Sequence, residues 1–79
     1  MTKTINSPVL VTAIDFGRDM IAYPKRMEWG GRTYRFIDRG IRVTSRRGEQ
    51  ITSTITMSDG EQNFCLRACG GLWTLLSVS

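Results

Sequence analysis

Residues 51–78 read ITSTITMSDGEQNFCLRACGGLWTLLSV, and this stretch decides the fold. Two turn signals, Asp59-Gly60 and Gly70-Gly71, separate short runs rich in Thr, Ile, Leu and aromatic residues, a pattern typical of tight β-hairpins. Pairing across a two-residue Asp59-Gly60 turn places Ile55 opposite Phe64 on a mostly apolar face and leaves the threonines on the other face. The stretch therefore predicts a three-stranded antiparallel meander.

The same turn chemistry recurs upstream. Gly30-Gly31 predicts a hairpin in which Arg26 lies opposite Arg35. Gly48 predicts a three-residue loop, which we prefer to a two-residue turn because the loop places Val43 on the core side. No segment has the periodicity of a helix. We therefore expect an all-β fold, a small antiparallel meander of five to six strands that forms an SH3-like barrel or a rolled sheet.

The chain has 79 residues, which is the size of one small domain. We expect residues 1–7 to be a flexible N-terminal segment and residues 8–79 to be a single barrel-like domain, with a bulge, bend or short turn at residues 38–40. The apolar runs are far shorter than the roughly 20 residues of a membrane helix, and none follows the start as in a secretory signal. We therefore expect a cytoplasmic protein that does not enter the membrane.

Positive charge is concentrated in one segment. Eight of the 11 basic residues lie in residues 25–47, together with only two of the seven acidic residues. Arginines outnumber lysines nine to two, and a guanidinium group binds phosphate through two parallel hydrogen bonds. We expect an outer sheet face and a loop that contact nucleic-acid phosphates with little sequence preference. The predicted nucleic-acid-binding residues are Arg26, Arg35, Arg42, Arg46, Arg47, Arg67 and Trp29.

Two alternatives stay open for this basic segment, an acidic protein partner and a solvated face that binds nothing. Trp29 also has two interpretations. It is either a core residue at the end of a strand or a half-exposed ring beside Arg32, where a cation–π contact or stacking on a base becomes available.

An apolar patch suggests a second class of function, protein interaction. The patch lies on the face of the predicted meander that should face solvent. The predicted interface residues are Cys65, Leu72, Leu76 and Val78. Either a strand over about residues 9 to 16 covers this patch as in a closed barrel, or another chain covers it. The alternative function is therefore a protein-interaction domain or a homodimer.

Residues suited to catalysis or metal binding are scarce. The chain has no His, and its Ser and Thr hydroxyls lack an identifiable base to activate them. On one extended strand, Cys65 and Cys69 would lie about 13 Å apart, which exceeds the reach of a disulfide. With no second Cys pair, a zinc site lacks ligands. We expect no enzyme activity, no cofactor and no metal site.

Several short motifs carry a resemblance that spans most of the chain. The run Trp29-Gly-Gly-Arg-Thr-Tyr-Arg35 and the closing Gly71-Leu-Trp-Thr-Leu75, with Ser7-Pro-Val9, Pro24 and Val78, resemble a family of short, functionally uncharacterised bacterial all-β proteins. About residues 38–59 depart from the family pattern, which usually carries further tryptophans there. The resemblance implies a bacterial, cytosolic all-β domain and an association with DNA-repair polymerase neighbourhoods, but it carries over no functional residue.

Overall fold

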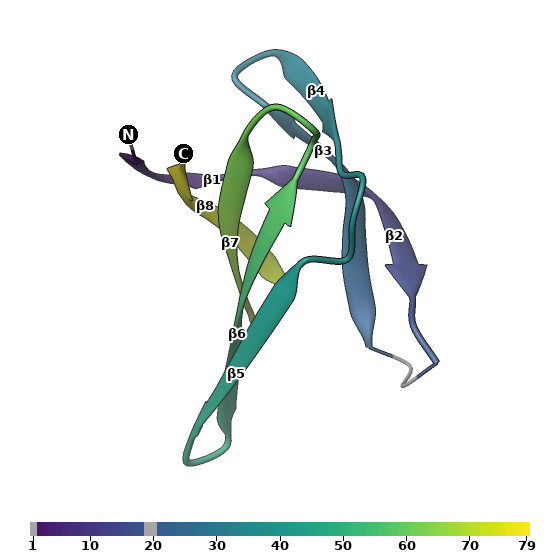
Figure 1. The fold of residues 1–79 in the computed structure, drawn as a ribbon. Coiled ribbons are helices and arrows are strands. Elements are labelled where there is room, and N and C mark those ends of the chain that lie inside the picture. Colours follow the sequence, from purple (N-terminus) through teal and green to yellow (C-terminus); the bar gives the residue numbers. More distant parts are fainter. Residues whose placement is uncertain (1, 19–20) are drawn as a thin grey trace.

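The structure, a computed structural model, describes residues 2–18 and 21–79. This part of the chain forms eight β-strands in two antiparallel sheets (Figure 1). The strands are β1 (Lys3–Pro8), β2 (Leu10–Phe16), β3 (Ala22–Trp29), β4 (Arg32–Arg35), β5 (Ile41–Arg47), β6 (Gln50–Ser58), β7 (Asn63–Cys69) and β8 (Leu72–Val78). The larger sheet has the order β1-β8-β7-β6-β5, and the smaller has the order β2-β3-β4. The all-β prediction is confirmed, but the described strands exceed the expected five or six and form two sheets rather than one closed barrel.

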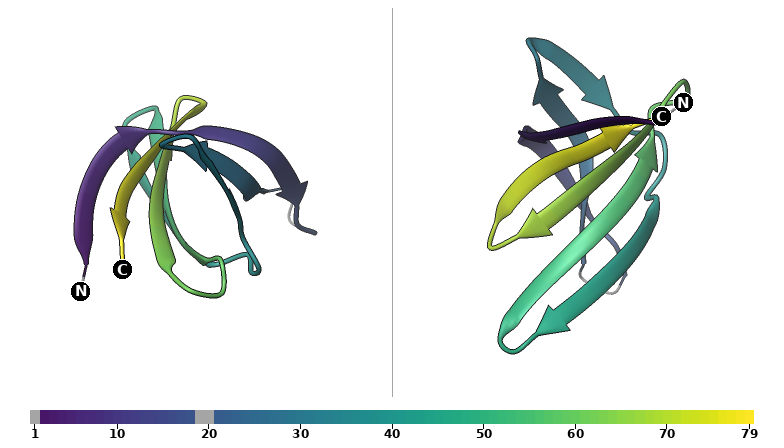
Figure 2. Two further views of the ribbon diagram at one scale, coloured as in Figure 1. Left: turned by 90° about the horizontal axis from the view of Figure 1, so that it is seen from above. Right: turned by 90° about the vertical axis from the view of Figure 1, so that its left-hand side faces the viewer.

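The first corner between the sheets lies at Val9, the single residue that separates β1 of the larger sheet from β2 of the smaller sheet. The Val9 amide donates to the carbonyl oxygen of Trp73 in β8 at 3.1 Å, whereas the next residue, Leu10, pairs with Glu28 of β3. Figure 2 shows β1 and β2 as one arc that passes from the larger sheet to the smaller sheet. One nearly continuous strand therefore joins the sheets at this corner.

A second corner follows β4. The Phe36 amide donates to the carbonyl oxygen of Lys25 in β3, and the Ile37 amide donates to that of Ser58 in β6, both at 2.9 Å. The Ser58 amide in turn donates to Oδ1 of Asp38 at 3.0 Å. The chain bends at residues 37 and 38 and then passes through Gly40, so a change of direction occurs where we expected one.

Most of the predicted N-terminal segment belongs to the larger sheet. Strand β1 pairs with β8, where Lys3 lies opposite Val78 and Ser7 lies opposite Leu75. Asn6 has a φ of 52° at the irregularity in this pairing, a conformation that Asn adopts more readily than most residues. We expected residues 1–7 to lie outside the domain, and the pairing of residues 3–8 corrects that boundary.

The core lies between the sheets and centres on Phe64, which is fully buried in β7. Its ring centroid lies 5.2 Å from that of Tyr34 and 5.7 Å from that of Phe36, both at the smaller sheet. The other buried apolar residues are Met27, Ile55, Met57, Leu66, Leu75 and Val78. Aromatic contacts across the two sheets therefore hold them together.

The β3–β4 hairpin has the predicted register. Its pairs include Arg26 with Arg35, Met27 with Tyr34 and Trp29 with Arg32. The β6–β7 hairpin differs from prediction by two residues, because residues 59–62 form a four-residue connection and Ile55 pairs with Leu66. A slip of two keeps every side chain on its predicted face, so the buried and exposed sides are still correct.

The β5–β6 register differs by an odd number of residues, and this error exchanges the two faces. The turn consists of Gly48 and Glu49, so Val43 pairs with Thr54 and Arg42 pairs with Ile55. Val43 is 61% exposed, although we expected it on the core side. Arg42 shares the inner face with buried Ile55, although we expected it on the outer face.

The β7–β8 pairing agrees with prediction from Cys69–Leu72 to Leu66–Leu75. An irregularity then adds one residue to β8, so Phe64 pairs with Val78 instead of Ser77. Val78 consequently points into the core and is only 7% exposed. The prediction that Val78 belongs to an exposed interface patch is therefore wrong.

The first prediction concerns Gly40, which has a φ of +67°. A Cβ at this position would lie 2.1 Å from the carbonyl oxygen of Thr56 and 2.8 Å from Cγ of Met57. We expect Gly40→Ala to lower the free energy of unfolding by about 3 kcal/mol or more, because backbone strain and a steric clash add together. Gly48→Ala is the matched control, since Gly48 has a φ of +63° but no neighbouring atom within 4 Å. It should lose only about 1–2 kcal/mol. Urea denaturation measures both variants, and an equal loss of unfolding free energy in Gly40→Ala and Gly48→Ala would contradict the steric clash at Gly40.

The second prediction concerns Asp59. Its Oδ1 accepts hydrogen bonds from the amides of Gln62 at 2.8 Å and Glu61 at 2.9 Å, and these bonds lower the pKa of the carboxyl group. The charged form stabilises the fold above the unfolded pKa of about 4, and this contribution disappears as pH falls through the lower folded pKa. Asp59→Asn keeps an acceptor oxygen without the charge. It should cost less than about 1 kcal/mol at neutral pH, because solvent screens the group.

Urea denaturation over a descending pH series measures the difference in unfolding free energy between Asp59→Asn and the parent. This difference should shrink as the parent carboxyl becomes protonated. A difference that stays constant down to about pH 2.5 would contradict the role of the Asp59 charge.

Candidate cationic hollow on the smaller sheet

Arg26 and Arg35 lie opposite each other on the outer face of the smaller sheet. Their neighbours Met27 and Tyr34 pack inward, and alternation along each strand turns the two arginines outward. Arg26 Nε donates to the hydroxyl of Thr12 in β2 at 2.9 Å. The structure therefore places this predicted pair as expected and shows that a neighbouring strand orients one of its members.

Lys25, Arg26 and Arg35 line one small open hollow of about 250 Å³, together with Ala13 and Phe36. We call it the cationic hollow. No carboxylate lines it, and none of the three cations has an ion pair among the described residues. The single ion pair in the described part of the chain joins Arg39 to Asp15 elsewhere, at 3.3 Å. Among the described residues, the lining thus contains three basic residues and no acidic one.

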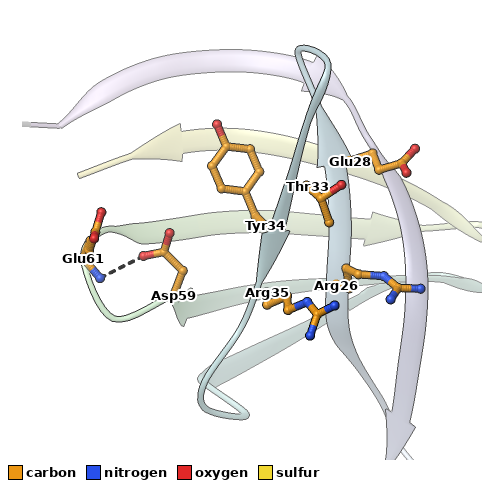
Figure 3. Close-up of a pocket in the computed structure, with 7 residues that line it drawn as sticks. All are labelled: Arg26, Glu28, Thr33, Tyr34, Arg35, Asp59 and Glu61. Atoms are coloured by element: carbon orange, nitrogen blue, oxygen red, sulfur yellow. Dashed lines mark hydrogen bonds between the residues drawn. The ribbon is translucent and has the colours of Figure 1, made fainter.

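The same two arginines also border a larger groove of about 690 Å³, shown in Figure 3. Its lining residues are Arg26, Glu28, Thr33, Tyr34, Arg35, Asp59 and Glu61. In Figure 3, Asp59 and Glu61 lie on one side of β4, and the two arginines lie close together beyond it. Three carboxylates against two guanidinium groups disfavour a polyanion in this groove, so an anion is better accommodated in the cationic hollow.

Arg42 is not part of an outer arginine surface. Its Nη2 donates to the carbonyl oxygen of Ala22 in β3, and its guanidinium carbon lies 5.0 Å from the centre of the Tyr23 ring. Arg39 approaches the same ring at 5.7 Å. Arg42 therefore links β5 to the smaller sheet, and the prediction that it lies on the outer face is wrong.

The other predicted arginines lie in two further places. Arg67 is on the outer face of the larger sheet, paired with Thr54 and Thr74. Arg46 and Arg47 end β5 at the tip of the β5–β6 hairpin, which projects away from the β3–β4 hairpin in Figure 1. The predicted arginines consequently do not form one continuous surface.

Trp29 is half-buried, packs against the core and lies next to Tyr34, with ring centroids 6.0 Å apart. Arg32 is opposite Trp29 as expected. Among the described residues, however, the cation–π contacts involve Tyr23 and none involves Trp29. Trp29 therefore has a packing role, but the residue is not fully covered.

The predicted apolar patch is smaller than expected. Leu72 is 74% exposed, whereas Cys65 and Leu76 are half-buried and Val78 belongs to the core. Strand β2 does not cover this patch, because it pairs with β3 in the smaller sheet. What remains is one prominent leucine beside partly covered side chains.

Both cysteines are free thiols. The Thr52 hydroxyl and the Gln50 amide donate to Sγ of Cys69, at 3.6 Å and 3.1 Å, and lower the pKa of its thiol. In residues 2–18 and 21–79, no three His, Cys, Asp or Glu side chains gather as metal ligands. The described part of the chain contains no helix of the length and apolarity that crossing a membrane requires.

Comparisons with protein-family models, with curated proteins and with solved structures found no match for this chain. The resemblance to a bacterial all-β family therefore stays a prediction. The cationic hollow, the groove with mixed charge and the exposed apolar residues are the features from which a function can be argued.

Proposed function

We propose that this protein is a small, non-enzymatic cytoplasmic module that binds nucleic-acid phosphates through the cationic hollow, with little sequence preference. The observation that carries the proposal is that Lys25, Arg26 and Arg35 line one hollow to which no carboxylate of the described residues contributes. The two sheets, joined at two corners, would act as a rolled, SH3-like scaffold that presents the β3–β4 hairpin to the ligand.

The geometry around Arg26 supports phosphate as the ligand. The hydroxyl of Thr12 engages Nε of Arg26, while the terminal nitrogens have no hydrogen-bond partner among the described residues. Two terminal nitrogens that share a plane suit the oxygens of a phosphate group. A side chain that is already oriented also loses less conformational entropy on binding.

The pairing of Arg26 with Arg35 supports the same ligand. Like charges directly opposite each other on one sheet face are unfavourable, and an anion between them converts repulsion into attraction. The net charge of +4 adds a long-range attraction that steers polyanions toward the protein. Contacts confined to phosphates do not distinguish one base sequence from another.

The third prediction tests this hollow with Arg26→Gln/Arg35→Gln. We measure binding of a fluorescently labelled duplex by anisotropy across a salt series. The parent should bind more weakly as salt rises, because phosphate contacts release counterions. The double variant should lose about tenfold in affinity at low salt, and its salt slope should fall by about 1 to 2 units.

Arg46→Gln/Arg47→Gln is the matched control, because it removes the same charge at the distant hairpin tip. It should weaken binding much less than the variant in the hollow. Equal losses would assign binding to diffuse charge. Absence of any salt-dependent binding by the parent would contradict the proposal and leave an acidic protein partner or a solvated face as the explanations of the basic segment.

Assembly of two copies of the chain is the second candidate function. The observation that favours it concerns strand β5 and not the apolar patch predicted from the sequence. Strand β5 is an edge strand, and its outer side chains Ile41 and Val43 are 73% and 61% exposed. An exposed edge with apolar side chains is a template for pairing with a strand of another chain. We therefore propose β5 pairing between two copies as the alternative to nucleic-acid binding.

The fourth prediction tests this assembly by sedimentation. The parent should show a mass that increases with concentration, and Val43→Lys should stay monomeric because it places a charge at the edge. Leu72→Lys, which alters the patch predicted from sequence, should assemble like the parent. A parent that stays monomeric at every concentration, or loss of assembly only in Leu72→Lys, would eliminate pairing through β5.

A further inference from the structure

A second groove, of about 710 Å³, lies where the β3–β4 hairpin approaches β1 and the end of β8. Its lining residues are Thr2, Lys3, Ile5, Trp29, Arg32, Tyr34, Gln62, Val78 and Ser79. Ile5, Trp29 and Tyr34 are partly buried residues that pack against the core, and Val78 belongs to the core itself. The groove therefore has an apolar, partly aromatic floor, and we call it the aromatic groove.

Trp29 is half-buried and lines this groove. The Trp29 and Tyr34 centroids are 6.0 Å apart with a tilt of 36°, so these rings contact each other and leave no gap for a third ring between them. Trp29 and Arg32 also line a neighbouring hollow, whose other lining residues include Pro8, Leu10 and the acidic Glu28. A planar ligand can thus reach Trp29 without displacing Tyr34 from the core.

The charged side chains that line the aromatic groove are both positive. Lys3 and Arg32 line it, no Asp or Glu side chain does, and neither cation has an ion pair among the described residues. Arg32 lies directly opposite Trp29 in the β3–β4 register. A flat ring that stacks on Trp29 would therefore place an attached anionic group within reach of a guanidinium group.

A flat aromatic ring with an attached anion is the chemistry of a nucleotide. We infer that the aromatic groove holds an unpaired base of single-stranded nucleic acid on Trp29, with the adjacent phosphate at Arg32 and Lys3, an assignment that rests on the proposed function for the class of ligand. Stacking on an aromatic side chain tolerates any base, in keeping with phosphate contacts that read no sequence. Bases in a duplex are already stacked and paired, so this groove favours single strands.

The fifth prediction uses the indole N–H signals of the full chain in an NMR titration, with Trp73→Phe to assign the two tryptophans. The probes are an oligothymidylate of about ten nucleotides, a duplex of the same length and thymidine monophosphate. The Trp29 signal should shift with the single strand and much less with the duplex. Trp29→Ala should reduce single-strand affinity about tenfold and leave duplex affinity unchanged.

Two variants keep the test decisive if Trp29→Ala does not fold. Trp29→Phe retains a ring and should bind the single strand almost as the parent does. Arg32 is exposed, so Arg32→Gln should fold, weaken single-strand binding and reduce the salt dependence of that binding. Single-strand binding with an unmoved Trp29 signal would overturn the inference. Binding of the monophosphate as tight as that of the strand, or an equal Trp29 shift with an acidic peptide, would overturn it too.

Failure of the two proposals can be told apart. If the duplex binds and Arg26→Gln/Arg35→Gln weakens it, while Trp29 responds to neither nucleic acid, only the role of the aromatic groove is wrong. If the single strand shifts Trp29 but Arg26→Gln/Arg35→Gln changes no affinity, only the cationic hollow is wrong.

Discussion

The contact of Phe64 with Tyr34 and Phe36 is the interaction on which the rest of this structure depends. Phe64 belongs to the larger sheet, and its two partners belong to the smaller sheet and the corner that follows it. Because these rings occupy the space between the sheets, the inner side of the β3–β4 hairpin is committed to packing. The other side of the hairpin must then face solvent, and this is where Arg26 and Arg35 lie.

The register of each hairpin could be predicted where the residues of the turn alone determine the length of the loop. Two adjacent glycines with positive φ determine the β3–β4 register, and it was correct. The β6–β7 loop is longer than predicted because the Asp59 side chain accepts hydrogen bonds from two backbone amides. The register shifted by two residues, so each side chain stayed on its predicted face. At the β5–β6 turn, Gly48 is compatible with two loop lengths. The wrong loop length assigned Val43 and Arg42 to the wrong faces of the sheet. The sequence of this strand alone does not show that it is an edge strand, on which an apolar side chain such as Val43 faces solvent.

The candidate site was predictable to the same extent. The Arg26–Arg35 pair follows from one hairpin, so the sequence was sufficient to find it. The approach of Lys25, the exclusion of carboxylates from that hollow and the position of Asp59 beside the opposite groove depend on how the strands of two sheets meet. Pairing rules within a hairpin carry no information about such contacts. The sequence left Trp29 open between a core residue and a half-exposed ring, whereas Lys3, which lines the same groove, comes from a strand that we expected to be outside the domain.

Because β1 and β2 form nearly one strand, this one segment contributes to both sheets. Its partner in the larger sheet is β8, so β1 is synthesised long before the strand with which it pairs. Closure of such a long loop slows folding compared with a chain of local hairpins. The larger sheet therefore cannot be completed early, and a ribosome-bound chain of this protein keeps an unpaired β1 until β8 has emerged.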